Sequence, residues 1–317
     1  MGIDYTTTGI IASIKRRAIF PTSQNLYLPQ DIANILTEEL HSYVVPLIMK
    51  EHEEYLVTNY DQAITAGKQN YFIPYQAMGL KVRDVVLVTS GGEEIGLARV
   101  EPEELKLIRS GAAYWRQGFY FDNDQVILVP TNQDYSSYTL RMKIFRRPNN
   151  LVLSSAAAQI SVVTPGTKTI TVSTTIPTTW TTAMTFDLIK GKPSFRCNGE
   201  NLAVTTISGF DIVMTAALPS DLAVGDWIAL NGFSPIPQIP YEIHRILEQR
   251  AVVKILEGMK DKGGMENAMN DLDGANNPTS MVANFRALVS PRADGSVQRL
   301  VSKGGIARNM GGRARFT

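Results

Sequence analysis

The sequence predicts a mixed α+β protein with a helical stem, inserted β-rich domains and an extended C-terminal arm. Residues 29–50 and 240–262 carry the helical prediction, because both repeat apolar side chains at i, i+3, i+4 and i+7. Between them, short segments rich in β-branched and aromatic residues alternate with turn residues. Each helix must bury its apolar stripe against another element. We therefore expect the two helices, one from each end of the chain, to pair antiparallel.

The N-terminal part, residues 1–52, is predicted to hold two helices of the stem. The first covers 6–18 and ends in basic side chains, which suit the unpaired carbonyls of a helix C-terminus. The second covers 29–50, with Pro29 in its first turn, where a missing N–H leaves no hydrogen bond unmade. Pro46 removes one backbone hydrogen bond inside this helix, so we expect a kink there.

Residues 53–150 are predicted to form a first β-rich domain. The segment 118–129 indicates a hairpin, because Asp122–Asp124 at its centre tolerates the backbone of a tight turn. A helix is expected between strands at 101–109. The strands are expected at 54–59, 71–74, 82–88, 95–100, 118–121, 125–129 and 139–145.

Residues 151–235 are predicted to form a second, inserted all-β domain. This stretch has 22 Ser or Thr among its 85 residues but only four Lys or Arg, which is a clear change from the preceding sequence. Its turn residues recur at the spacing of a small sandwich or barrel. The strands are expected at 159–163, 169–174, 185–189, 202–206, 210–214 and 227–230.

Residues 236–290 are predicted to return to helix and complete the stem. Within 240–262, apolar side chains recur at a spacing of four, and Gly263 and Gly264 are expected to end the helix. A weaker helix is expected near 281–289.

Composition excludes several classes of protein. The chain has 31 Lys or Arg and 30 Asp or Glu among 317 residues, so no global charge attracts nucleic acid or a membrane surface. A single cysteine, Cys197, excludes an internal disulfide and a cysteine-rich zinc site, and three histidines leave little material for a metal site. Because no segment has 18 consecutive apolar residues, we expect no membrane-spanning helix.

The motif search points away from catalysis. The sequence has no phosphate-binding loop, no dinucleotide-binding fingerprint, no zinc-protease motif and no nucleophile elbow. His244 and Glu248 stand one helical turn apart and admit two interpretations, a proton-active pair or an ordinary surface pair worth about 0.3 kcal/mol. The second is favoured. We therefore expect no enzymatic activity, no cofactor and no metal.

The C-terminal arm, residues 291–317, differs from the rest of the chain in charge. Between Arg286 and Thr317 there are seven cations and one acid, Asp294, in a chain whose net charge is +1. Three interpretations are open: docking on an acidic protein surface, contact with DNA phosphates, or a solvated tail. Docking is favoured, because several glycines free the backbone to lie along another chain.

Four segments taken together resemble a known family. They are IPYQAMGLKVRDVVLV at 73–88, LRMKIFRRPNNLVL at 140–153, IPQIPYEIHRILEQRAVVKILEG at 236–258 and LVSPRADGSVQRLVSKGG at 288–305. Their order along the chain is similar to that in the larger head-to-tail connector adaptors, which are virion proteins of tailed bacteriophages. The insertion at 151–235 departs from the small, all-helical members.

The resemblance implies a structural role without enzymatic activity. It implies a homo-oligomeric ring, typically of twelve copies, bound beneath the portal protein at the head–tail interface of the virion, after assembly in the host cytoplasm. Tail or stopper proteins would bind the ring, and genomic DNA would pass through its channel with transient, non-specific contacts. The cations expected to bind the portal are Arg292, Arg299, Lys303, Arg308, Arg313 and Arg315. The side chains expected to pack between subunits are Ile35, Leu36, Leu247, Ala251 and Ile255.

Two alternatives are kept beside this interpretation. The nearer one is another neck or tail structural protein, such as a stopper or a baseplate component. The more distant one is a β-domain that binds a ligand or nucleic acid, which would need a basic, aromatic-lined face. The 151–235 stretch has almost no cations to supply such a face.

Overall fold

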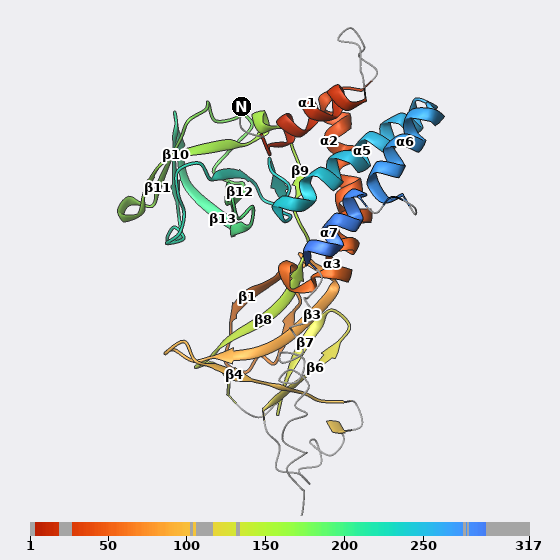
Figure 1. Cartoon of the computed structure of the whole chain (residues 1–317). Helices are drawn as coiled ribbons and strands as arrows, with labels where there is room; N and C mark the ends of the chain where they lie inside the picture. The colour runs from red at the N-terminus through yellow and green to blue at the C-terminus, as the bar shows by residue number, and fades with distance from the viewer. Residues whose placement is uncertain are drawn as a thin grey trace, which may run out of the picture.

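The computed structural model describes residues 4–18, 27–101, 104–105, 117–130, 134–274, 277 and 279–289. The fold is mixed α+β and includes a small β-barrel, in agreement with the predicted class. Figure 1 shows three lobes: a group of helices, a pair of sheets below it and the barrel to one side. We call them the helical unit, the sheet unit and the barrel.

The helical unit draws its helices from both ends of the described chain. They are α1 (Thr7–Arg17), α2 (Pro29–Glu39), a π-helical turn η1 (Leu40–Val44), α3 (Val45–Glu51), α5 (His244–Gly258), α6 (Lys262–Asp273) and α7 (Met281–Val289). Short 3-10 turns stand at η2 (Glu53–Leu56), η3 (Ser154–Ala156), η4 (Pro165–Thr167) and η5 (Tyr241–Ile243). α5 contacts α1, α2, α6 and α7, so it is the central element of this unit.

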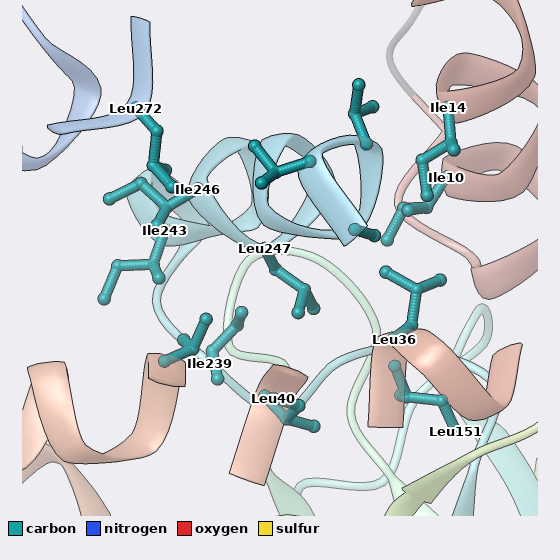
Figure 2. Packing of buried hydrophobic residues seen from close by; sticks show 14 of the residues in the cluster. Ile10, Ile14, Leu36, Leu40, Leu151, Ile239, Ile243, Ile246, Leu247 and Leu272 are labelled. Atoms are coloured by element: carbon teal, nitrogen blue, oxygen red, sulfur yellow. The ribbon is translucent and has the colours of Figure 1, made fainter. Parts of the chain in front are cut away.

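One apolar core holds the helical unit together. In Figure 2, Leu247 of α5 points into a space lined by Leu36, Leu40 and Ile239, while Ile10 and Ile14 of α1 approach from the side. All these side chains are buried. Burying an aliphatic side chain of this size contributes about 1.5–3 kcal/mol. The core therefore depends on residues that are more than 200 positions apart in the sequence.

The sheet unit is built from two four-stranded sheets that share a core. One sheet has the order β1 (Val57–Ala63), β8 (Thr139–Arg146), β3 (Ala77–Val88) and β4 (Glu94–Gly96). The other has the order β2 (Asn70–Phe72), β7 (Gln125–Val129), β6 (Gly118–Asp122) and β5 (Ala98–Arg99). Val85, Met142 and Val126 are buried between them.

The predicted hairpin at 118–129 is confirmed. β6 and β7 pair antiparallel, and Asn123 at the turn adopts a left-handed backbone with φ 53°. The strand predicted at 95–100 is wrong, because it divides between β4 and β5, which belong to different sheets. The helix predicted at 101–109 lies largely outside the described residues.

The barrel confirms the all-β interpretation of residues 151–235 and selects the barrel over the sandwich. Six strands close on themselves in the order β10, β11, β14, β13, β12, β15. Their bounds are β10 (Ala158–Thr164), β11 (Thr169–Val172), β12 (Thr185–Ile189), β13 (Cys197–Ser208), β14 (Asp211–Met214) and β15 (Trp227–Leu230). Phe186, Ile170 and Ile228 fill the interior, while threonines alternate outward on β11.

A short clasp closes the neck of the barrel. β9 (Asn150–Leu151) leads into the barrel and β16 (Phe233–Ser234) leads out of it, and the two pair in parallel. Two hydrogen bonds flank the pair, from the amide of Asn150 to the carbonyl of Gly232 and from the amide of Val152 to the carbonyl of Ser234. The chain therefore enters and leaves the barrel at one place.

The kink expected at Pro46 takes the form of a π-helical turn just before it. The N–H of Val45 bonds to the carbonyl of Leu40, five residues back, so η1 contains one residue more than an α-turn would. The long helix predicted at 29–50 is thus divided into α2, η1 and α3.

The predicted end of the C-terminal helix at Gly263 is wrong. α5 ends at Gly258, Lys260 turns the chain in a left-handed backbone with φ 60°, and a new helix begins. The carboxylate of Asp261 caps α6 by accepting a hydrogen bond from the amide of Gly264 at 3.0 Å. The two glycines therefore open a helix rather than end one.

Candidate functional site

The predicted subunit-packing residues lie in the core of a single chain. Leu36, Leu247, Ala251 and Ile255 are completely buried within it, and Ile35 is half-buried against the same core. Their apolar stripes are used inside the helical unit, between α2 and α5. Four of the five therefore have no surface left for a second subunit, and the expected inter-subunit role is corrected to an intra-chain one.

The predicted portal-binding cations lie outside the described residues. Arg292, Arg299, Lys303, Arg308, Arg313 and Arg315 all follow Val289, the last described position. Their contact with a portal protein stays a prediction.

The strongest polar cluster sits where the three units meet. Arg146, at the end of β8, is buried and bonds to Glu200 of β13, to the side-chain oxygen of Gln238 at 3.0 Å and to that of Asn149 at 3.0 Å. Glu200 belongs to the barrel, and Gln238 belongs to the segment that leads into α5. One guanidinium therefore ties all three units together, and its fixed fork suits this task.

A buried carboxylate completes this junction. Asp187 of β12 is 1 % exposed and accepts hydrogen bonds from the Asn149 side chain at 2.7 Å, the Asn201 amide at 2.9 Å and the Gly232 amide at 2.9 Å. A buried charge is stable only where its lone pairs are satisfied. The network therefore fixes the barrel against the end of β8.

Cys197 lines a small cavity beside this junction, but it has no reactive character. The cavity measures about 90 Å³ and is also lined by Tyr55, Arg196 and Gln238. Burial raises the pKa of the Cys197 thiol to about 12, although the nearby Arg146 opposes the shift. A thiol of this kind is not a nucleophile near neutral pH.

Two ion pairs with buried carboxylates join α5 to the N-terminal helices. Arg250 Nε lies 2.6 Å from Glu39 Oε2, and Arg17 Nε lies 3.0 Å from Glu248 Oε1. Glu248 also accepts a hydrogen bond from the hydroxyl of Ser13. Such pairs contribute register more than net stability, because desolvation offsets most of the attraction.

The predicted surface pair of His244 and Glu248 is wrong. His244 is buried among Tyr5 and Phe195, and its Nε2 lies 3.3 Å from the carbonyl of Ile239. A carbonyl only accepts, so Nε2 is the donor in this contact. Burial lowers the pKa of His244 to about 4. Glu248 is instead paired with Arg17, and helical spacing alone cannot reveal that competing partner.

Two absences hold for the described part of the chain. No group of three or more His, Cys, Asp or Glu side chains among these residues could hold a metal ion. No helix found in the same ranges is both long and apolar enough to cross a membrane.

Comparison with protein-family models found no match, and comparison with curated proteins found no relative.

Proposed function

We propose that this chain is a structural subunit of the head-to-tail connector of a tailed bacteriophage, an adaptor that forms a ring beneath the portal. The resemblance of the four segments from 73 to 305 motivates the proposal. The helical unit would act as the stem, with antiparallel helices from the two chain ends, and the C-terminal arm would reach the portal. Tail or stopper proteins would bind the opposite face of the ring, at the head–tail interface of the virion.

The observation that best supports a structural role is the junction. Three separately packed cores are held in fixed relation by two buried charged side chains, Arg146 and Asp187, and their partners. A ring subunit must present several distant surfaces in constant geometry, and such a junction provides that rigidity. The near-neutral charge of the chain is also suited to a DNA conduit, because each phosphate contact would add salt-dependent affinity and slow the passage of DNA.

Electron microscopy of the purified full-length chain mixed with portal rings tests the proposal. We expect rings of this chain stacked on one end of the portal. Deletion of residues 292–317 should leave a folded protein that no longer sediments with the portal, because a threaded arm repeated around a ring multiplies weak contacts.

A matched control separates charge from chain length. Replacing the six arm cations by glutamine, with the arm kept, should also abolish binding. If the truncated chain sediments with the portal as well as the full-length chain does, the arm is a solvated tail. If neither the full-length chain nor the truncated chain binds a portal under any condition, the connector function is wrong.

A further inference from the structure

An open groove runs between the N-terminal helices and the sheet unit. It has a volume of about 600 Å³, and its apolar floor is formed by Val45, Pro46 and Met49 from α3 and by Met78 from β3. Methionine side chains adapt to irregular surfaces and recur where proteins bind helices. The groove therefore has the floor of a protein-docking surface.

A bulge in β3 with a strained backbone forms one wall of this groove. β3 bulges strongly against β8: Ala77 pairs with Arg146 and Val82 with Ile144, so β3 uses five steps where β8 uses two. Gly79 and Leu80 in the bulge both have φ 55°, and Leu80 is 42 % exposed. A left-handed leucine is strained, and such strain recurs at functional surfaces.

The rim of the groove is cationic. Arg147 and Lys81 are exposed on it, and His41 stands beside them. Lys81 forms an ion pair with Glu53, with 3.7 Å between Nζ and Oε2. Arg147, by contrast, has no ion pair with any residue in the described ranges. The occupant that fits this groove is consequently an apolar side chain flanked by carboxylates.

The chain itself carries such a face on α6. Glu266, Met269 and Asp273 are exposed at positions i, i+3 and i+7, so they form one stripe with methionine at its centre. Neither carboxylate forms an ion pair within the part of the chain described here. Arg250, which approaches the Met269 sulfur, is already paired with Glu39.

The groove and the α6 stripe lie on different sides of the helical unit. Met49 lines the groove, whereas Glu51 of the same helix pairs with Arg286 of α7 at 3.1 Å. Two residues along an α-helix point about 200° apart. α7 in turn contacts α6. One copy can therefore offer its α6 stripe to the groove of the next copy without using its own groove.

We propose that the groove lined by Met49, Met78 and Arg147 binds the Glu266–Met269–Asp273 stripe of a second copy of this chain. The contact is head-to-tail, since the two surfaces differ, and repeated contacts of this type close into a ring or extend into a filament. The α6 stripe of a second copy is assigned to the groove because its charge and shape are complementary to it. The expectation that the copies close into a ring rests on the proposed function. The arm of the chain is excluded as occupant, because its cations would meet the cationic rim.

Charge reversal tests the contact in the full-length protein. We expect the wild-type chain to self-associate in sedimentation velocity, and Arg147→Glu or the pair Glu266→Lys with Asp273→Lys to weaken association at least tenfold. Mixing the two variants should restore assembly, because each reversed surface then meets its reversed partner. Lys68→Glu, an exposed cation of the sheet unit, should have no effect. Circular dichroism confirms that each variant is folded.

A cross-link provides a second readout. The double variant Met49→Cys with Met269→Cys should form a ladder of covalent multimers on oxidation, and each single variant should not. Wild-type chains that stay monomeric with and without portal, Arg147→Glu chains that assemble normally, or assembly that needs an added acidic protein would each overturn the proposal. Chains that self-associate by this contact but never bind a portal would refute the connector function and leave the interface intact.

Discussion

The barrel and the helical unit build their apolar cores in opposite ways. The barrel core comes from one continuous stretch, from Ala158 to Ile228, and three of its six strand pairings join strands that are consecutive in sequence. The helical core combines Ile10 of α1 with Leu247 of α5 and Phe285 of α7, so it needs both ends of the described chain. We therefore expect the barrel to fold by itself, whereas the helical unit needs distant segments of the chain to meet.

This difference lies in where conformational entropy is lost. Closing a long loop costs little more than closing a short one, since the cost grows only with the logarithm of loop length. Non-local contacts nevertheless slow folding, because the loop must close before any contact forms. The pairs Arg17–Glu248 and Arg250–Glu39, whose carboxylates are buried, link α5 to helices more than 200 residues away in the sequence and so favour one register.

Excision should give the largest effect. Residues 151–235 expressed alone should show a β-type far-UV spectrum and cooperative unfolding. Residues 1–52 expressed alone should lose their helical core completely, because the segment from Ile239 to Phe285 supplies about half of it. Circular dichroism with thermal melts measures both. A disordered spectrum for 151–235, or a stable fold for 1–52, would remove the contrast between the two units.

A charged residue introduced into one core at a time should show whether the two units unfold separately in the intact chain. Leu247→Asp in the helical core and Ile228→Asp in the barrel both replace completely buried side chains. Each should cost about 4 kcal/mol or more, because an unpaired charge cannot be hydrated there. In scanning calorimetry, we expect Leu247→Asp to abolish the unfolding transition of the helical unit and Ile228→Asp to abolish that of the barrel. Loss of both transitions in either variant would mean that the units unfold as one.

Acid should destabilise the helical unit through His244. The pKa of this buried ring is about 4 in the folded chain against 6.5 for an unburied histidine. The unfolded chain therefore binds a proton first, and stability falls by about 3 kcal/mol as the pH falls from 6.5 to 4. Urea unfolding at a series of pH values should show this loss.

Two controls isolate the histidine. His244→Phe should flatten the pH dependence over the same window, whatever its effect on absolute stability. The excised barrel, residues 151–235, contains no histidine and should lack this dependence altogether. An equal slope in the wild type and the variant would assign the acid sensitivity to other groups.

The smallest effect is expected at a backbone turn. Lys260 ends α5 with φ 60° and is exposed, so Lys260→Gly should stabilise the helical unit by about 0.5–1 kcal/mol. The melting transition assigned to the helical unit should rise, and that of the barrel should not move. Lys260→Ala is the matched control and should have no such benefit.

The spacing of apolar residues predicted the helices and strands whose apolar faces form the cores. It missed the features that depend on particular polar contacts. The stripe around Leu247 and the strands of the barrel follow from apolar spacing alone. α6 was missed, because two glycines usually end a helix and only the cap from Asp261 shows that they begin one here. The junction could not be predicted, since Arg146, Asp187 and Gln238 are far apart in sequence and carry no shared motif.

The clasp at the neck of the barrel determines how the molecule carries tension. A pull that separates the end of β8 from the start of α5 draws backward on the start of β9 and forward on the end of β16. Because these strands are parallel, the two forces act along the strands in opposite directions, and the hydrogen bonds from Asn150 and Val152 are loaded together in shear. An antiparallel clasp would open one bond at a time, like a zip. The barrel is thereby protected from the load, and its own strands stay paired while the clasp holds.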